Sequence, residues 1–353
     1  MEKAKTVFKG IGILLLVLIG ILLLLVVYLT VREYRPKAEE TVEGNYKDGE
    51  LLSLSRPFSV MSYNTGYASL SKDEDFFMDG GSKVKPGSKS LVEDNLDGIT
   101  KILQDNPSDV YFLQEVDINS TRSYSIDQRS VYSEALNKTS FFAYNFKCDF
   151  VPYPIPPMGH VESGLVTLTD NYVTDAVRLS LPESFSWPVK TCNLKRCLLV
   201  TRFPLKDSSK ELVLINFHLE AYDSGEGKIA QSKMLADVLA REYEKGNYVI
   251  AGGDFNQTFE GIDKYPVTNK EDWVPGVIGE SDLPEHFSFA IDDSFPTCRL
   301  LNAPYTGSYD TSQVYVIDGF LVSDNLAVRN VNVIDVGFEY TDHQPVRLEV
   351  AFK

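Results

Sequence analysis

The chain has 353 residues, of which 43% are hydrophobic and 24% charged, so it can bury a sizeable core without disulfide or metal cross-links. Its net charge is −16, and residues 38–353 alone hold 28 basic and 48 acidic residues. A body this acidic argues against a protein whose main task is to bind the phosphate backbone of nucleic acid, because such proteins present a basic surface.

The N-terminal residues predict a membrane anchor. Gly10 to Val31 contain no charged residue and are long enough to cross a bilayer as a helix. The stretch is longer than the apolar segment of a cleaved signal peptide, and no small-x-small cleavage site follows it. Three basic residues flank it on each side, so the positive-inside rule does not decide the orientation. We expect a cytoplasmic tail over residues 1–9, a single-pass span over residues 10–31 and an extracellular body.

The rest of the chain predicts one mixed α/β domain. Residues 32–50 are polar and aperiodic, which is typical of a linker. From Arg56 onward, short β-rich runs alternate with two segments of helical periodicity, residues 91–103 and 229–243. This mixture indicates two packed sheets with helices outside them. No second linker interrupts residues 51–353, so we expect a single domain there.

Two stretches of the body lack a clear pattern, residues 148–160 and 257–312. Long irregular loops in a compact domain usually serve function rather than the core. We therefore expect these two stretches to influence which substrate is bound.

The four cysteines form no CxxC pair, which argues against a zinc cage. Cys192 and Cys197 flank four residues and would bridge a hairpin if the body faces an oxidising space. The alternative is four free thiols, with Cys148 and Cys298 as the other two. The sequence leaves both readings open.

Six apolar runs meet a polar side chain at one end. FSVMSY ends at Asn64, DVYFLQ at Glu115, ELVLINF at His218, YVIAGG at Asp254 with Asn256 beside it, and QVYVI at Asp318, while Asp342 and His343 precede PVRLEVAF. If these ends lie together, four carboxylates, two imidazoles and two amides gather at one point. Burying so many acids together is unfavourable unless a cation neutralises them. Oxygen ligands suit Mg²⁺ or Mn²⁺, and a hard cation among carboxylates suits chemistry on phosphate esters.

Each residue alone has a simpler explanation. Asp254 and Asn256 suit an Asx turn after a strand, Glu115 suits the solvated end of a strand, and His218 suits a structural histidine. The set as a whole favours a catalytic site, since the chain has only four histidines and two of them fall at these ends.

The motifs YNTG, LQEVD, NFHLEA, GGDFN, VIDGFLVS and TDHQPV, in this order, resemble those of the endonuclease/exonuclease/phosphatase superfamily. These are metal-dependent phosphoesterases related to deoxyribonuclease I and to neutral sphingomyelinase. The resemblance covers residues 56–353 and implies a four-layered α/β/β/α sandwich, here preceded by one transmembrane helix. It implies a catalytic domain over residues 51–353 that hydrolyses a phosphodiester or phosphomonoester by metal-assisted attack of water.

The resemblance also implies a metal site and a general base. Glu115 is expected to bind Mg²⁺, or Mn²⁺ in its place, with Asn64 beside it and Asp342 near the ion. Asp254 is expected to orient or deprotonate the attacking water. Whether Asp254 or His343 is the general base stays open.

The remaining motif residues are expected to contact the phosphate. Asn256 would hydrogen-bond the phosphoryl oxygens, and His343 would contact the phosphate with its ring oriented by Asp318 through the other nitrogen. His218 would either stabilise the pentacoordinate charge or protonate the leaving oxygen.

Three further residues are candidates for substrate binding. Arg122 either reaches a substrate phosphate with a bidentate fork or is a surface arginine that pairs with an acid. Arg299 either lines the substrate side or forms a buried structural pair. His160 is a candidate from the proline-rich loop, whereas His286 is expected at the surface.

The substrate class stays open: a lipid head group, DNA or RNA, or a small phosphorylated metabolite. The membrane tether favours a lipid, whereas anionic lipid surfaces would repel so acidic a body. A non-catalytic binding module with the same fold is the alternative class of function. The complete motif set argues against it. Which proteins, if any, are partners stays open.

Overall fold

The computed structural model describes residues 2–44, 49–206, 208–223 and 225–353. Met1 of the predicted tail and residues 45–48 of the predicted linker lie outside the described residues. The longer helices are α1 (Glu2–Arg32), α2 (Lys89–Asp105), α3 (Gln128–Leu136) and α4 (Glu226–Glu244). Both segments with helical periodicity lie within helices, α2 and α4, whereas α3 has no counterpart among the predicted elements.

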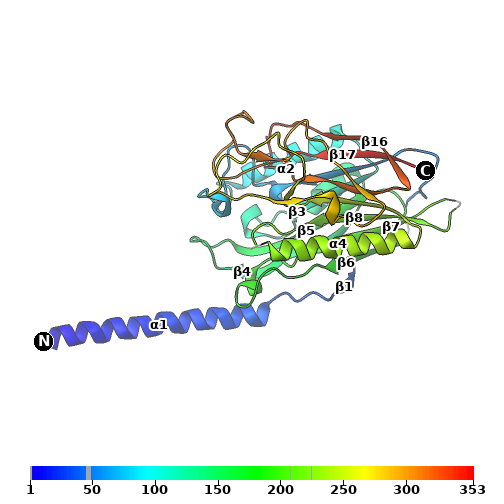
Figure 1. The fold of residues 1–353 in the computed structure, drawn as a ribbon. Helices are drawn as coiled ribbons and strands as arrows, with labels where there is room; N and C mark the ends of the chain where they lie inside the picture. Colours follow the sequence, from blue (N-terminus) through cyan, green and yellow to red (C-terminus); the bar gives the residue numbers. More distant parts are fainter. Residues whose placement is uncertain (1, 45–48, 207, 224) are drawn as a thin grey trace.

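Two large sheets form the body (Figure 1). The seven-stranded sheet has the order β1 (Glu39–Thr41), β6 (Asp175–Ser180), β7 (Cys197–Pro204), β8 (Glu211–His218), β9 (Tyr248–Asp254), β15 (Asp318–Ser323) and β12 (Phe287–Ala290). The six-stranded sheet has the order β16 (Leu326–Val333), β17 (Val346–Phe352), β2 (Phe58–Asn64), β3 (Val110–Asp117), β5 (Gly159–Thr169) and β4 (Thr139–Val151). Two small pairs complete the strands, β10 (Gln257–Phe259) with β11 (Gly276–Ile278) and β13 (Cys298–Arg299) with β14 (Val314–Tyr315).

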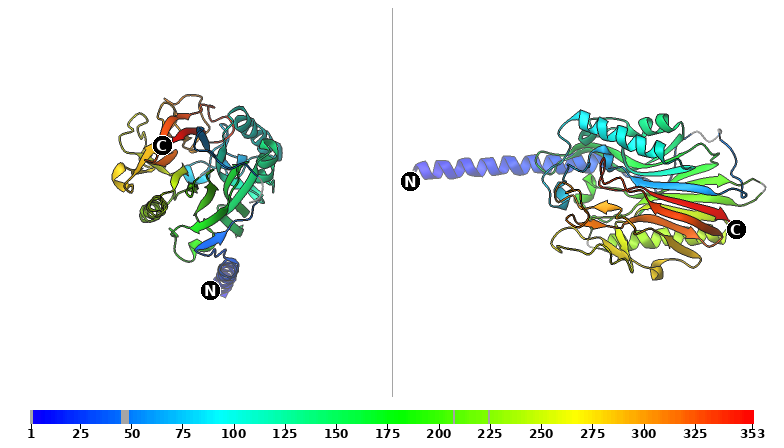
Figure 2. Two further views of the ribbon diagram at one scale, coloured as in Figure 1. Left: turned by 90° about the vertical axis from the view of Figure 1, so that its right-hand side faces the viewer. Right: turned by 90° about the horizontal axis from the view of Figure 1, so that it is seen from above.

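Hydrophobic packing produces four layers. Between the sheets, residues such as Phe112, Leu214 and Phe320 form the central core. Leu96 of α2 belongs to the core on the outer face of the six-stranded sheet, and Leu239 of α4 to that on the outer face of the seven-stranded sheet. Each amphipathic helix thus covers one outer face, and the predicted α/β/β/α sandwich is confirmed (Figure 2).

The N-terminal helix stands out from this sandwich, and its last turns contact β4 and the short turn η4 (Val189–Cys192). Its segment Lys5–Arg32 is long and apolar enough to cross a membrane, judged by length and composition. Beyond the helix, Glu33 lies 3.0 Å from Lys195 in a buried ion pair. Glu39–Thr41 then pair antiparallel with β6, so part of the predicted linker adds an edge strand to the sheet.

All four cysteines are buried free thiols in the structure. In the structure, Cys192 and Cys197 are therefore free thiols and do not form a disulfide with each other. Cys192 ends η4, whereas Cys197 opens β7 and its Sγ lies 3.3 Å from Asn145 Oδ1.

A buried ion pair between α4 and β7 predicts a pH-dependent stability. Glu242 accepts hydrogen bonds from Arg202 and Lys245, each at 2.7 Å. Burial raises the pKa of Glu242, but these cations and the Asn247 amide outweigh it and hold the pKa at about 2. Because this is below the ordinary value of 4.5, the stabilisation is complete above pH 4.5 and disappears as the pH falls toward 2.

Glu242→Gln is accordingly expected to lower the free energy of unfolding at pH 7 by about 2 kcal/mol, measured by urea denaturation. Near pH 2 the variant and the wild type should be equally stable. Glu93→Gln is the matched control, because the Lys89–Glu93 pair on α2 is exposed and contributes little. An equal loss at both pH values would contradict the electrostatic origin of the effect.

Candidate active site

Strand pairing brings the polar strand ends together. β2 is parallel to β3, and β8 is parallel to β9. Four of the predicted site residues therefore lie at or near the carboxyl ends of these strands: Asn64, Glu115, His218 and Asp254. In the seven-stranded sheet, Asp254 is paired in register with His218 on one side and with Asp318 on the other.

Asp318 differs from the prediction in one respect. The sequence predicted that it ends a strand over QVYVI, but only Val314–Tyr315 form a short strand there and Asp318 opens β15. Because β15 is antiparallel to β9, the first residue of β15 lies beside the last residue of β9. The side chain thus reaches the same end of the sandwich from the opposite chain direction.

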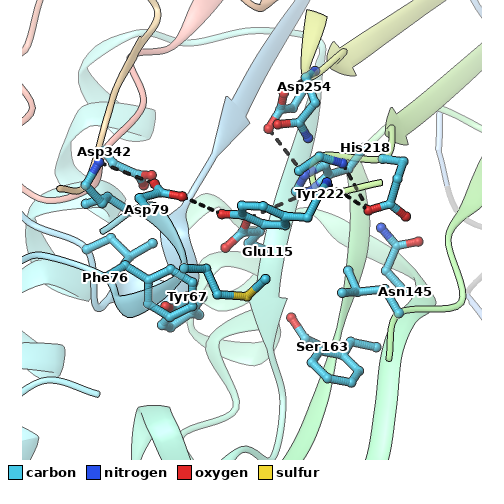
Figure 3. Close-up of a pocket in the computed structure, with 18 of the residues that line it drawn as sticks. Tyr67, Phe76, Asp79, Glu115, Asn145, Ser163, His218, Tyr222, Asp254 and Asp342 are labelled. Carbon is cyan, nitrogen blue, oxygen red and sulfur yellow. Dashed lines mark hydrogen bonds and ion pairs between the residues drawn. The ribbon is translucent and has the colours of Figure 1, made fainter. Parts of the chain in front are cut away.

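Glu115, His218, Asp254 and Asp342 lie around one pocket (Figure 3), and short contacts join the site residues into a cluster. Asn64 Nδ2 lies 3.0 Å from Asp254 Oδ2, and 3.4 Å from both Glu115 Oε1 and His343 Nε2. The same Asp254 oxygen lies 3.3 Å from His218 Nε2 and 3.7 Å from His343 Nε2. The carboxyl of Glu115 and the imidazole of His343 thus both lie beside one amide group.

The backbone is unusual at two of the site residues. Glu115 and Asn256 have φ angles of 55° and 50°, in the left-handed region that residues other than glycine rarely adopt. A register shift in the pairing of β3 with β5, between Leu113 and Val116, flanks Glu115, and such bulges redirect side chains near active sites. Strained conformations cluster where function fixes the geometry. The Asx turn that the sequence allowed is also present, since Asn256 N donates to Asp254 Oδ1 at 2.8 Å.

The crowded carboxylates are poorly solvated. Burial, followed by the charge of Asp342, raises the pKa of Glu115 to about 7. Burial, followed by the charge of Asp318, raises the pKa of Asp254 to about 6. Burial also raises the pKa of Asp342. These groups repel one another when ionised, so a bound cation would stabilise all three.

The two imidazoles have opposite charge states. Burial, then the cations of Arg196 and His343, lower the pKa of His218 well below its ordinary value, so its ring is neutral. Burial alone would lower the pKa of His343 too. However, Asp318 Oδ2 lies 2.8 Å from Nδ1 of His343. The charge of Asp318 and of the neighbouring acids outweighs burial and raises the pKa of His343 well above its ordinary value. The ring of His343 is therefore protonated.

Two groups of three possible ligand atoms lie within 4.8 Å of one another: Asp254, Asp318 and His343, and Cys298, Asp342 and His343. Both groups need His343, whose Nδ1 is already hydrogen-bonded to Asp318 and whose pKa the neighbouring acids raise. A metal would have to displace a proton from this ring, and the raised pKa opposes that loss. Neither group is therefore favoured as the metal site.

The residues predicted to bind metal fit a hard cation better. Glu115, Asp342 and Asn64 offer oxygen ligands, and Glu115 is less buried than its neighbours, with 26% of its side chain exposed. Carboxylate, amide and water oxygens are what Mg²⁺ prefers. The amide oxygen of Asn64 accepts from Gly66 N at 3.1 Å, so an amide flip is needed to present it to the ion.

Arg122 is buried and its fork is occupied. Its Nη2 and Nε lie 2.9 and 3.1 Å from the two carboxylate oxygens of Asp117, and its guanidinium stacks 3.5 Å from the ring centre of Tyr67. Of the two roles predicted for Arg122, the structure shows the one in which it pairs with an acid. The pair is buried rather than at the surface, because Asp117 is an inward-facing residue of β3.

Arg299 and His160 are placed differently from each other. Arg299 is fully buried and lines the cavity, and its guanidinium donates to carbonyl oxygens such as those of Ser71 and Glu74, at 2.8 and 3.0 Å. The predicted structural pair is thus made with the backbone rather than with an acid. His160 has a side chain 32% exposed, 3.9 Å from Glu162, and is not among the described residues that line the cavity.

A cavity with a volume of about 140 Å³ opens at the cluster, roughly ten times the space that one water molecule needs. It contains functional groups that were not predicted. Tyr222 donates to Asp79 at 2.8 Å, and burial raises the pKa of Asp79 to about 6 (Figure 3). Arg196 donates to the carbonyl of His218 at 3.1 Å and lies 3.4 Å from Glu220. Glu220 and Tyr222 follow His218 so closely that the NFHLEA motif could have indicated them.

Fold and site together define a metal-dependent phosphoesterase class, in which a two-sheet sandwich gathers acids and histidines at its strand ends. The chain belongs to the Endonuclease/Exonuclease/phosphatase family, whose family model matches residues 61–343. Enzymes of this family are hydrolases of phosphate esters. No curated protein matches the sequence.

Solved structures show the same fold at low sequence identity. An endonuclease/exonuclease/phosphatase from Beutenbergia cavernae has a TM-score of 0.59 and 18% identity, covering 84% of this chain and 72% of that chain. The human Nocturnin catalytic domain with bound sulfate has a TM-score of 0.52 and 15% identity, covering 88% and 97%. TDP2 from Caenorhabditis elegans has a TM-score of 0.51 and 15% identity, covering 86% and 76%. At these identities the likeness supports the fold alone.

Proposed function

We propose that this protein is a membrane-anchored, Mg²⁺-dependent phosphoesterase that hydrolyses a phosphodiester or phosphomonoester by attack of water. The observation that carries the proposal is the convergence of acids and imidazoles from four strand ends (Glu115, His218, Asp254, and Asp342 with His343) on one cavity. Residues 10–31 would span the membrane, residues 1–9 would stay in the cytoplasm, and residues 51–353 would form the extracellular catalytic domain.

Glu115, Asp342 and Asn64 would hold the ion. When bound, Mg²⁺ supplies positive charge that polarises a phosphoryl oxygen. The basic residues that line the cavity are all engaged by protein groups: Arg122, Arg196 and Arg299. No lysine or unengaged arginine is among the described lining residues, so the charge of the substrate phosphate depends on the ion and on His343 for neutralisation.

We assign the general base to Asp254. Its Oδ1 accepts from the backbone of Asn256, and its Oδ2, which accepts from Asn64 Nδ2 at 3.0 Å, keeps a second lone pair that can take a proton from water. A carboxylate with a pKa of about 6 suits this role near neutral pH. His343 already holds its proton, so its Nε2–H donates to the phosphate while Asp318 accepts from Nδ1.

His218 and Asn256 would complete the phosphate site. The neutral ring of His218 donates one hydrogen bond, which suits stabilisation of the pentacoordinate charge better than protonation of the leaving group. The Asn256 amide donates one of its two hydrogens to Leu219 O at 2.9 Å. The other hydrogen remains for a phosphoryl oxygen.

Removal of the metal tests the proposal directly. EDTA is expected to lower hydrolysis of bis(p-nitrophenyl) phosphate by the full-length chain in detergent by about 10²-fold or more, and Mg²⁺ should restore it. Ca²⁺ should restore less, because it takes more ligands at longer distances. Hydrolysis that resists EDTA would reject metal dependence. Absence of both hydrolysis and Mn²⁺ binding would instead favour a non-catalytic module.

A further inference from the structure

The apolar wall of the catalytic cavity is continuous with the N-terminal helix. Leu25 and Leu29 of α1 pack into a hydrophobic cluster that also contains Phe146, Val151 and Met158. These last three residues line the catalytic cavity. One hydrophobic cluster therefore connects the end of the proposed membrane span to the cavity.

Trp187 connects the body to α1 near the end of the apolar run of the helix. Its indole Nε1 donates to Thr30 Oγ1 at 3.0 Å, at the end of the apolar run. Tryptophan prefers the membrane–water interface, and Arg32, paired with Asp149, follows just beyond it. Leu25 precedes Thr30 by five residues, or roughly 7.5 Å along the helix. Leu25 packs against the cluster, so the part of the cluster around it would extend past the interface into the apolar region of the bilayer.

Two loops expose large apolar side chains beside this helix end. The loop between β4 and β5 carries Ile155, which is 95% exposed, and the segment leading into η4 carries Trp187, which is 58% exposed. The same two loops supply Tyr153 and Phe185 to the cavity lining. Apolar groups this exposed are unfavourable in water and typical of surfaces that enter a membrane interface.

The site lies at the end of the sandwich from which α1 emerges. In Figure 2, β17 begins on the α1 side and runs to the C terminus at the opposite end. His343 precedes the first residue of β17 by three positions and belongs to the site. The strand ends that form the site therefore face the plane in which α1 would be embedded.

We propose, on the basis of the phosphoesterase function above, that the cavity opens onto the bilayer and that the substrate is a phosphate ester in the head group of a membrane lipid. The loops with Ile155 and Trp187 enter the interface, and the acyl chains stay in the bilayer beside the apolar wall. Asp254 takes a proton from water as the water oxygen forms a new bond to phosphorus, the bond to the leaving oxygen breaks, and that oxygen takes up a proton from solvent. Apolar contact rather than charge holds the loops at the surface, since the acidic body is repelled by anionic lipid.

The test uses the full-length chain in phosphatidylcholine vesicles that contain sphingomyelin, phosphatidylethanolamine and phosphatidylglycerol, with Mg²⁺ present. Released head groups are measured by mass spectrometry, and bis(p-nitrophenyl) phosphate, plasmid DNA and RNA are assayed in parallel. The double variant Ile155→Ser, Trp187→Ser is expected to lose about tenfold in lipid hydrolysis and to keep hydrolysis of the soluble diester within about twofold. Val328→Ser is the control, because Val328 is also exposed but lies on β16, and it should change neither activity.

The outcomes separate this inference from the function on which it rests. If the double variant loses lipid and soluble-diester hydrolysis equally, the loops do not act at the membrane and the inference is wrong. If the wild type hydrolyses the soluble diester or nucleic acid but no lipid, the inference is wrong while the phosphoesterase function stands. If no phosphate ester is hydrolysed at all, the proposed function itself fails.

Discussion

Glu115→Gln is expected to lower kcat for bis(p-nitrophenyl) phosphate by about 10³-fold or more. Glutamine keeps the shape of the side chain but removes the charge that would hold the ion. Glu115 is the most exposed carboxylate of the cluster, and its Oε1 lies 3.4 Å from Asn64 Nδ2 and 3.9 Å from His218 Nδ1. Asp342, the other carboxylate expected at the ion, would keep only part of the negative charge, so the loss should be large. Steady-state kinetics at saturating Mg²⁺ measures it.

The same variant should not lose stability. Burial and the charge of Asp342 raise the pKa of Glu115 to about 7, so in the metal-free protein its ionised form destabilises the fold above pH 4.5, the ordinary pKa. Neutral glutamine removes that cost, and Tm in EDTA at pH 8 should be unchanged or higher. Glu74→Gln is the buried control, since Glu74 pairs with Lys83 at 3.0 Å outside the cavity. It should keep activity within about twofold. A Glu115→Gln protein with a tenth of wild-type activity would show that Glu115 does not hold the ion.

The strand-end residues were predictable because they depend on local pattern and chain direction. An apolar run that stops at an acid or an amide shows where a strand ends, and parallel pairing of β2 with β3 and of β8 with β9 puts such ends at one edge. The helical periodicity of residues 229–243 similarly fixed α4. Predicting these features requires only the pattern of neighbouring residues and the alternation of strands and helices along the chain.

The other contacts depend on packing between distant segments. Three of the carbonyl groups around Arg299 come from residues 70–74, and the partner of Tyr222 is Asp79, 143 positions away. Nothing in the irregular sequence around Asp79 indicates that its carboxylate faces a cavity. Arg122 shows a different limit, because Asp117 is only five residues away and β3 is buried on both faces. The Asp117 carboxylate therefore already pairs with the Arg122 guanidinium, which is not available to a substrate phosphate.

Asp318→Asn is expected to lower kcat by about 10²-fold to 10⁴-fold, with a much smaller change in KM. The Asp318 carboxylate orients the His343 ring through the 2.8 Å contact to Nδ1 and keeps the ring protonated. Asparagine can accept from Nδ1 through its oxygen, but it lacks the charge, and its amide hydrogens favour the wrong tautomer. Asp318 acts through His343 as a positioning residue, so the affinity for Mn²⁺ should change little.

The protein contains its own control for this substitution. Asp324 Oδ2 lies 2.8 Å from Nδ1 of His286, the same pair at the same distance, but on an exposed part of the body. Asp324→Asn should leave kcat within about twofold of the wild type. Comparable losses in both variants would mean that aspartate–histidine pairs matter here through stability alone. A loss confined to Asp318→Asn, at unchanged Tm, would instead assign it to the proton on His343, because burial and the position at the strand ends are what distinguish the two pairs.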